Sequence, residues 1–159
     1  MMTALTPAEE SANHDRHPQP TFGEPLSILG DLGIGPCHDA TIAGSWLFII
    51  GPDRLQVASL EDPARPKLVA ALSGLGNNTR QVWVVGSTTF ITSREDGLFL
   101  VDVGSPANPA LLSHYDTIEI ATGIAVSGKV AFVACRNYGV ELVDVTDPRQ
   151  PRHLSTVRT

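Results

Sequence analysis

Two neighbouring side chains, His38 and Asp39, have the chemistry of half a metal site or half an acid–base pair. Imidazole and carboxylate groups both bind metal ions and both transfer protons near neutral pH. The two cysteines, Cys37 and Cys135, lie too far apart in sequence to match a metal-binding spacing. The sequence therefore predicts no metal site and no cofactor, and the favoured alternative for His38 and Asp39 is a hydrogen-bonded strand cap.

A glycine-rich segment at Gly30–Gly35 has some likeness to a phosphate-binding loop. Such a loop binds phosphate through the amino end of the helix that follows it. Here Pro36 comes next and no helical pattern begins, so the dinucleotide-binding hypothesis fails.

The elements that must position any such residues come from an internal repeat. Gly44, Gly86 and Gly128 follow one another at intervals of 42 residues, each after an apolar run. Three Pro-x-x-Pro elements recur in the same phase, at 63–66, 106–109 and 148–151. The glycines and the Pro-x-x-Pro elements are independent signals, and their agreement in three successive units indicates tandem structural repeats.

Each unit contains four short apolar runs with the period-2 alternation of β-strands. A turn at the glycine separates the first two runs, and the Pro-x-x-Pro loop separates the last two. Asp102 and Asp144 end the third runs, where we expect them to brace that loop by hydrogen bonding to its backbone. The 14 glycines and 12 prolines, and the lack of helix-favouring runs, agree with an all-β fold.

We predict a partial β-propeller of about three four-stranded blades with a preceding extra strand. A unit of about 42 residues with four antiparallel strands is typical of a propeller blade. The predicted tail is polar and disordered and spans residues 1–24, and the leading strand, which is the fourth strand of an incomplete blade, spans 25–35. Blades 1, 2 and 3 are predicted at 36–73, 74–116 and 117–159.

Three segments of the repeat resemble the LVIVD-repeat family, and they lie at 97–109, 123–134 and 140–148. The resemblance covers roughly residues 25–159 and is weaker in the first unit, where Ser59 replaces the motif aspartate and the second turn is shorter. It implies a β-propeller of bacterial or archaeal origin, often at the cell surface and mostly without an assigned function. It implies no catalytic residues.

Three blades are too few to close a ring, because propellers typically have four to eight. We expect the chain to be the N-terminal part of a longer propeller, or a truncated gene product. The alternative is a dimer in which two three-blade halves make six blades. It is the less favoured alternative because each leading strand would be surplus.

Function on repeat scaffolds is usually carried by loops, since the strands are committed to packing. The loops around the channel mouth are those that lead into each first strand and those between the second and third strands. The candidate binding residues on them are His38, Asp39, Arg80, Gln81, Arg94, Arg136 and Asn137. A structural alternative remains open for the arginines of the second turns, namely pairing with a neighbouring acid such as Glu95.

The net charge of −6, without a basic stripe, argues against nucleic-acid binding. No apolar run is long enough to span a membrane, and acidic residues interrupt the amino-terminal region where a signal peptide would need an apolar stretch. The default expectation is a cytoplasmic location, although members of the family that the chain resembles are often at the cell surface.

We therefore expect a non-enzymatic binding or scaffolding module with a protein or small ligand at the channel mouth. Self-association through open blade edges is a further expectation. The competing hypothesis is a fragment of a propeller enzyme, whose hydrolytic or metal site would be completed by blades outside this chain.

Overall fold

The computed structural model describes residues 32–159, which form strands joined by turns and loops. The predicted tail and the predicted strand at 25–29 lie outside the described residues. The strands are β1 (Asp39–Ala43), β2 (Trp46–Gly51), β3 (Arg54–Ser59), β4 (Lys67–Ser73), β5 (Thr79–Val85), β6 (Thr88–Ser93), β7 (Gly97–Asp102), β8 (Ala110–Tyr115), β9 (Ala121–Ser127), β10 (Val130–Cys135), β11 (Gly139–Asp144) and β12 (Arg152–Val157).

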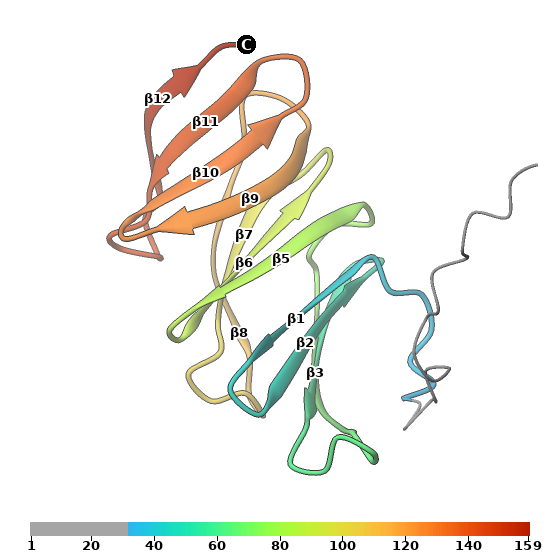
Figure 1. Ribbon diagram of the computed structural model, residues 1–159. Coiled ribbons are helices and arrows are strands. Elements are labelled where there is room, and N and C mark those ends of the chain that lie inside the picture. The colour runs from blue at the N-terminus through green and yellow to red at the C-terminus, as the bar shows by residue number, and fades with distance from the viewer. Residues whose placement is uncertain (1–31) are drawn as a thin grey trace, which may run out of the picture.

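These strands make three separate four-stranded sheets, each an antiparallel meander in chain order. We name them blade 1 (β1–β4), blade 2 (β5–β8) and blade 3 (β9–β12). Figure 1 shows the three sheets following one another along an arc that does not close. The first strands of neighbouring blades lie against each other, β1 beside β5 and β5 beside β9. The prediction of an all-β, partial propeller is therefore confirmed. Within residues 32–159 no helix is long and apolar enough to cross a membrane.

The repeated glycines do what the sequence pattern predicts of a tight turn. Gly44, Gly86 and Gly128 each join the first strand of a blade to the second, with φ values of 58–59°. That left-handed conformation is strained for residues with a Cβ atom. The same backbone turn therefore recurs in every blade.

A register shift also recurs at one position in every blade, between the third and fourth strands. It lies at Val57/Ala58, at Leu100/Val101 and at Leu142/Val143. A bulge of this kind adds local twist, which rotates the fourth strand relative to the rest of the sheet.

The motif aspartates brace the following loop as expected. Asp102 Oδ1 accepts a hydrogen bond from the backbone N–H of Gly104, and Asp144 Oδ1 accepts one from that of Thr146, both at 2.8 Å. In blade 1 the shorter Ser59 hydroxyl accepts the equivalent bond from the N–H of Glu61 at 3.3 Å. This longer contact is what the weaker motif of the first unit leads one to expect.

The hydrophobic core consists of two slabs, one at each boundary between blades. The slab between blades 1 and 2 contains Phe48, Ile50, Leu55, Val57, Leu75, Val82, Ile91, Phe99, Val101 and Val103. The slab between blades 2 and 3 contains Phe90, Leu98, Leu100, Ala121, Ile124, Ala131, Val133, Cys135, Val143 and Val145. Because alternate residues of a strand point to opposite faces, blade 2 contributes to both slabs and is covered on both sides.

Candidate functional site

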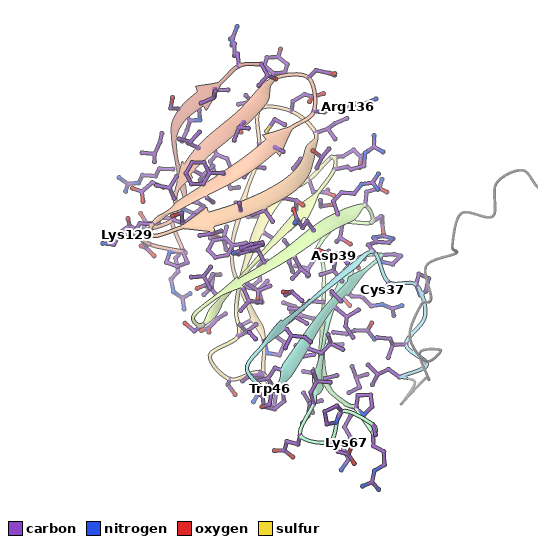
Figure 2. The ribbon with its side chains drawn as sticks, viewed as in Figure 1. Cys37, Asp39, Trp46, Lys67, Lys129 and Arg136 are labelled. Atoms are coloured by element: carbon purple, nitrogen blue, oxygen red, sulfur yellow. The ribbon has the colours of Figure 1, made fainter. Side chains whose placement is uncertain are left out.

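The candidate residues gather at one end of the sheets, which we call the second-turn face. It carries the turns at 52–53, 94–96 and 136–138 and the connections at 74–78 and 116–120. In Figure 2, Cys37, Asp39 and Arg136 lie along this side of the molecule, at the right of the view, whereas Lys129 projects at the left from the opposite ends of the strands. The fold therefore brings residues from all three blades to one face.

Asp39 and Gln81 are used to join neighbouring blades. Asp39 Oδ2 accepts a hydrogen bond from the backbone N–H of Val82 at 2.9 Å. Gln81 Oε1 accepts one from the backbone N–H of Ile124 at 2.7 Å. Since the first strand of a blade is an edge strand, these N–H groups have no partner within their own sheet. The two side chains supply the missing acceptor at the boundary between blades.

The same repeat position in blade 3 is Gly123, which has no side chain to offer. A Cβ atom built there would lie 3.3 Å from Gln81 Oε1. The series of bridges thus runs from blade 1 to blade 2 and from blade 2 to blade 3, and the described blades carry no acceptor for a further one at this position.

His38 also joins blades 1 and 2. Its Nδ1 atom lies 2.9 Å from the buried hydroxyl of Thr79, which donates a hydrogen bond to the carbonyl of Gly51 at 2.9 Å. The imidazole itself is exposed. His38 and Asp39 therefore act in strand-end hydrogen bonding, in agreement with the structural alternative that the sequence favoured.

The remaining candidate residues divide into two groups. Arg94 lies 3.7 Å from Glu95, and Asn137 is held by Glu119, whose two carboxylate oxygens accept its backbone and side-chain N–H groups at 3.0 and 3.2 Å. Arg80 and Arg136 are exposed, and neither guanidinium forms an ion pair within residues 32–159. These two arginines keep their charge available to a partner.

Exposed apolar side chains lie on the same face as these arginines. Tyr138, two residues after Arg136, is 47% exposed, and Ile118 in the connection to blade 3 is 45% exposed. Arginine, tyrosine and aliphatic side chains together have the composition typical of the centre of a protein interface.

A second cluster, which the sequence did not indicate, surrounds the buried carboxylate of Glu141 between blades 2 and 3. The Tyr115 hydroxyl donates to Oε1 at 2.6 Å and the backbone N–H of Ile118 donates to Oε2 at 3.0 Å. His153 Nδ1 lies 2.9 Å from Oε1, and the Cys135 thiol donates to Oε2 at 3.8 Å. Four groups from separate segments therefore compensate one buried charge.

The electrostatics of this cluster follow from burial and from these bonds. Burial alone would raise the pKa of Glu141, but the hydrogen bonds from Tyr115, Ile118 and His153 outweigh it and hold the pKa below its usual value. Burial and then the Glu141 charge raise the pKa of Cys135 to about 11. Burial and the hydrogen bond to Glu141 raise the pKa of Tyr115 above its ordinary value. The cluster thus holds one ionised carboxylate beside a protonated thiol and a protonated phenol.

Neither the second-turn face nor the Glu141 cluster has the arrangement of a metal site. Within residues 32–159 no three His, Cys, Asp or Glu side chains are placed to hold an ion. Two small polar hollows, of about 140 and 210 Å³, lie at the opposite ends of the strands. One is formed around Asp62 in the Pro-x-x-Pro loop of blade 1, and the other around Asp147 in that of blade 3.

The family model of the LVIVD repeat matches the chain at residues 76–117 and 120–159. The chain belongs to the LVIVD-repeat family. The two matches span the whole of blades 2 and 3, so the four-stranded blade is the structural form of the LVIVD repeat in this chain.

Among curated proteins no sequence matches this LVIVD-repeat chain. Solved structures match its fold. They include the computationally designed Ika4 protein, with a TM-score of 0.63, 12% identity and coverage of 86% of this chain and 80% of that one. The designed Ika8 protein matches with a TM-score of 0.61 and 10% identity, over 77% of this chain and 37% of that one.

The N-terminal domain of Nup159 matches with a TM-score of 0.57 and 10% identity, over 82% of this chain and 39% of that one. At these identities the likeness concerns the fold alone. The LVIVD-repeat chain spans less than two fifths of both Ika8 and the Nup159 domain.

Proposed function

We propose that this LVIVD-repeat chain is a non-enzymatic binding or scaffolding module whose second-turn face binds a protein partner. The observation that carries the proposal is that some polar residues of that face are bonded between blades whereas others are exposed. His38, Asp39 and Gln81 are engaged in bonds between blades, whereas Arg80 and Arg136 are exposed and unpaired within residues 32–159.

The exposed group favours a protein surface rather than a small polar substrate. Arginine and tyrosine contribute disproportionately to binding energy in protein interfaces, because they combine a large contact area with directional hydrogen bonds. Tyr138 and Ile118 supply apolar area on the same face as the arginines. Two unpaired positive charges favour a partner that presents carboxylates, and attraction of this kind weakens as salt is added.

A catalytic role would need titratable groups that converge on an open pocket. The convergent group here, around Glu141, is buried, and its carboxylate oxygens are already occupied by donors from the chain. The competing hypothesis of an enzyme fragment depends on blades outside this chain and stays a prediction.

The test is capture of partners from a lysate of the source cells by immobilised chain, followed by measured affinity for each purified candidate. The face variant combines Arg80→Ser, Arg136→Ser and Tyr138→Ser. A matched control variant removes two cations and one exposed apolar side chain elsewhere, through Lys129→Ser, Arg149→Ser and Leu111→Ser.

We expect a partner whose affinity falls at least tenfold with the face variant, is unchanged with the control variant and weakens with added salt. Equal affinity for both variants would place binding elsewhere on the molecule. The complete failure of any protein to bind the wild-type chain would contradict the proposal.

A further inference from the structure

The second turns of blades 2 and 3 stand at the same repeat position but differ in charge. Residues 94–96 read Arg-Glu-Asp, and residues 136–138, which follow 42 positions later, read Arg-Asn-Tyr. The turn of blade 2 therefore has one cation and two acids, whereas the turn of blade 3 has one cation and no acid. Two turns with the same place in the fold thus present different electrostatic surfaces.

The residue that follows the fourth strand lies against each turn and repeats this difference. A Cβ atom at Gly97 would lie 3.2 Å from the Cα atom of Asp116, and one at Gly139 would lie 3.0 Å from that of Arg158. Asp116 and Arg158 are 42 residues apart, and both are exposed. The neighbour of the turn is therefore an acid in blade 2 and a second cation in blade 3.

The two turns also differ in how their arginine is neutralised. In blade 2 the carboxylate of Glu95 lies 3.7 Å from Arg94 and accepts a hydrogen bond from Asn78 in the connection at 2.9 Å. In blade 3 the acid and the amide have exchanged places, because Glu119 in the connection accepts from Asn137 in the turn at 3.0 and 3.2 Å. This exchange removes the acid from the turn, and its arginine forms no ion pair within residues 32–159.

Apolar area lies beside the cations of blade 3. Tyr138 in the turn is 47% exposed and Ile118 in the connection is 45% exposed. The bonds between Glu119 and Asn137 fasten this connection to the turn. Blade 2 has an aspartate and a glycine at the positions of the two exposed apolar residues. We call Arg136, Arg158, Tyr138 and Ile118 the cationic patch.

We infer that the cationic patch is the part of the second-turn face that binds the partner, and that it binds an acidic peptide segment in which carboxylate and apolar side chains alternate. Guanidinium groups form strong, directional hydrogen bonds with carboxylates. The tyrosine and the isoleucine supply apolar contact area next to them. This inference rests on the proposed function and narrows it to one blade and one kind of partner segment.

The overall charge of −6 does not oppose such a partner. At physiological salt, exposed charges separated by more than about 8 Å are largely screened from one another. A carboxylate on the partner therefore responds mainly to the charges of the turn that it contacts. The acids of the blade 2 turn disfavour it, and the two arginines of the blade 3 turn attract it.

The test uses three synthetic octapeptides with blocked ends and a fluorescent label, in which leucine alternates with glutamate, glutamine or lysine. Fluorescence polarisation measures the affinity of the full chain for each peptide. We expect the glutamate peptide to bind and its affinity to fall as salt is added. The glutamine and lysine peptides should bind at least about fivefold more weakly.

Variants at exposed positions locate the site. Arg136→Gln combined with Arg158→Gln should weaken binding of the glutamate peptide by at least about fivefold, because both guanidinium groups are lost. Tyr138→Asp gives blade 3 the residue of blade 2 and should also weaken it. The control combines Lys129→Gln with Arg149→Gln, which changes the net charge equally at the opposite ends of the strands and should leave the affinity unchanged. Far-UV circular dichroism should be the same for all these chains.

Several results would overturn the inference. They are a failure of all three peptides to bind, a glutamine or lysine peptide that binds as tightly as the glutamate peptide, and a control variant as weak as the patch variant. The proposed function fails separately, if no protein partner binds the chain. A captured partner whose affinity depends on Arg80, but on neither Arg136 nor Arg158, would leave the proposed function intact and overturn the inference.

Discussion

At the scale of single residues, the polar side chains of the second-turn face have roles that depend on partners about one blade away. Asp39 and Gln81 follow the same rule, since each accepts from an N–H group 43 residues later in the chain. Such a side chain accepts a hydrogen bond from the edge strand of the next sheet. Its contribution to stability therefore depends on a residue outside its own blade.

The Gln81→Leu substitution tests this role, because it keeps the approximate volume and removes the acceptor. The N–H of Ile124 would then be left without its partner at a part-buried position. We expect a loss of about 1–3 kcal/mol in the free energy of unfolding, measured by urea denaturation. Arg80→Ser, at the exposed neighbouring residue, should change it by less than about 0.5 kcal/mol. Equal effects of the two substitutions would count against the bridging role.

The Glu141 cluster predicts a stability profile with a limit on the alkaline side. The pKa of Cys135 is raised from 9.0 to about 11 in the folded chain, so folding favours the protonated thiol. That contribution is fully present below pH 9 and is lost as the pH rises toward about 11. The raised pKa of Tyr115 acts in the same direction. The lowered pKa of Glu141 acts oppositely, with stability lost as the pH falls through its folded value.

Urea midpoints measured between pH 7 and pH 11 provide the check. The wild-type chain should lose stability from about pH 9 upward. In Cys135→Ala the onset should move to higher pH, where the tyrosine begins to contribute. An identical onset in both proteins would show that the thiol stays out of the titration.

At the scale of elements, the turn between the first and second strands of each blade requires glycine because of its backbone conformation and not because space is lacking. A Cβ atom at Gly128 would meet no atom within 4 Å, although the φ value there is 58°. At Gly139, in contrast, a Cβ atom would lie 2.1 Å from the carbonyl oxygen of Val157. The first glycine is required by its dihedral angle, and the second also by the close approach of the fourth strand.

Gly128→Val should therefore cost about 1–3 kcal/mol through backbone strain alone. Gly128→Asn is the matched control, because asparagine tolerates the left-handed region far better than a β-branched residue. Thermal unfolding of the two variants and the wild-type chain measures the difference. If valine and asparagine were equally tolerated, the positive φ at this turn would be in doubt.

At the scale of the whole molecule, equivalent residues have different environments because the arc is open. Phe90 is 3% exposed between blades 2 and 3, whereas Phe132, at the same repeat position, lies on the uncovered side of blade 3. A repeat protein is stabilised by the boundaries between neighbours as much as by each unit. The side of blade 3 that faces away from blade 2 is therefore less covered than the equivalent side of blade 2.

Much of the fold could be predicted from the sequence because the signals that define a blade are local. The glycine turns, the Pro-x-x-Pro loops and the aspartates that brace them act within a few residues, and they recur three times. The end of the sheets at which the candidate residues lie could also be predicted, from their positions within the repeat. The roles of these residues could not be predicted, and neither could the Glu141 cluster. That carboxylate is bonded by Tyr115 on β8, by Ile118 in the connection to blade 3 and by His153 on β12.

The sequence by itself determined that this chain forms LVIVD-type blades, because strand alternation and turn geometry depend on residues close together along the chain. Only the tertiary structure decided that Asp39 and Gln81 bridge blades, that Glu141 is buried among four donors, and that Arg80 and Arg136 remain free of ion pairs within residues 32–159. Those outcomes depend on how one sheet is rotated and seated on the next, which brings together groups from different repeats. No spacing within a single repeat encodes that arrangement.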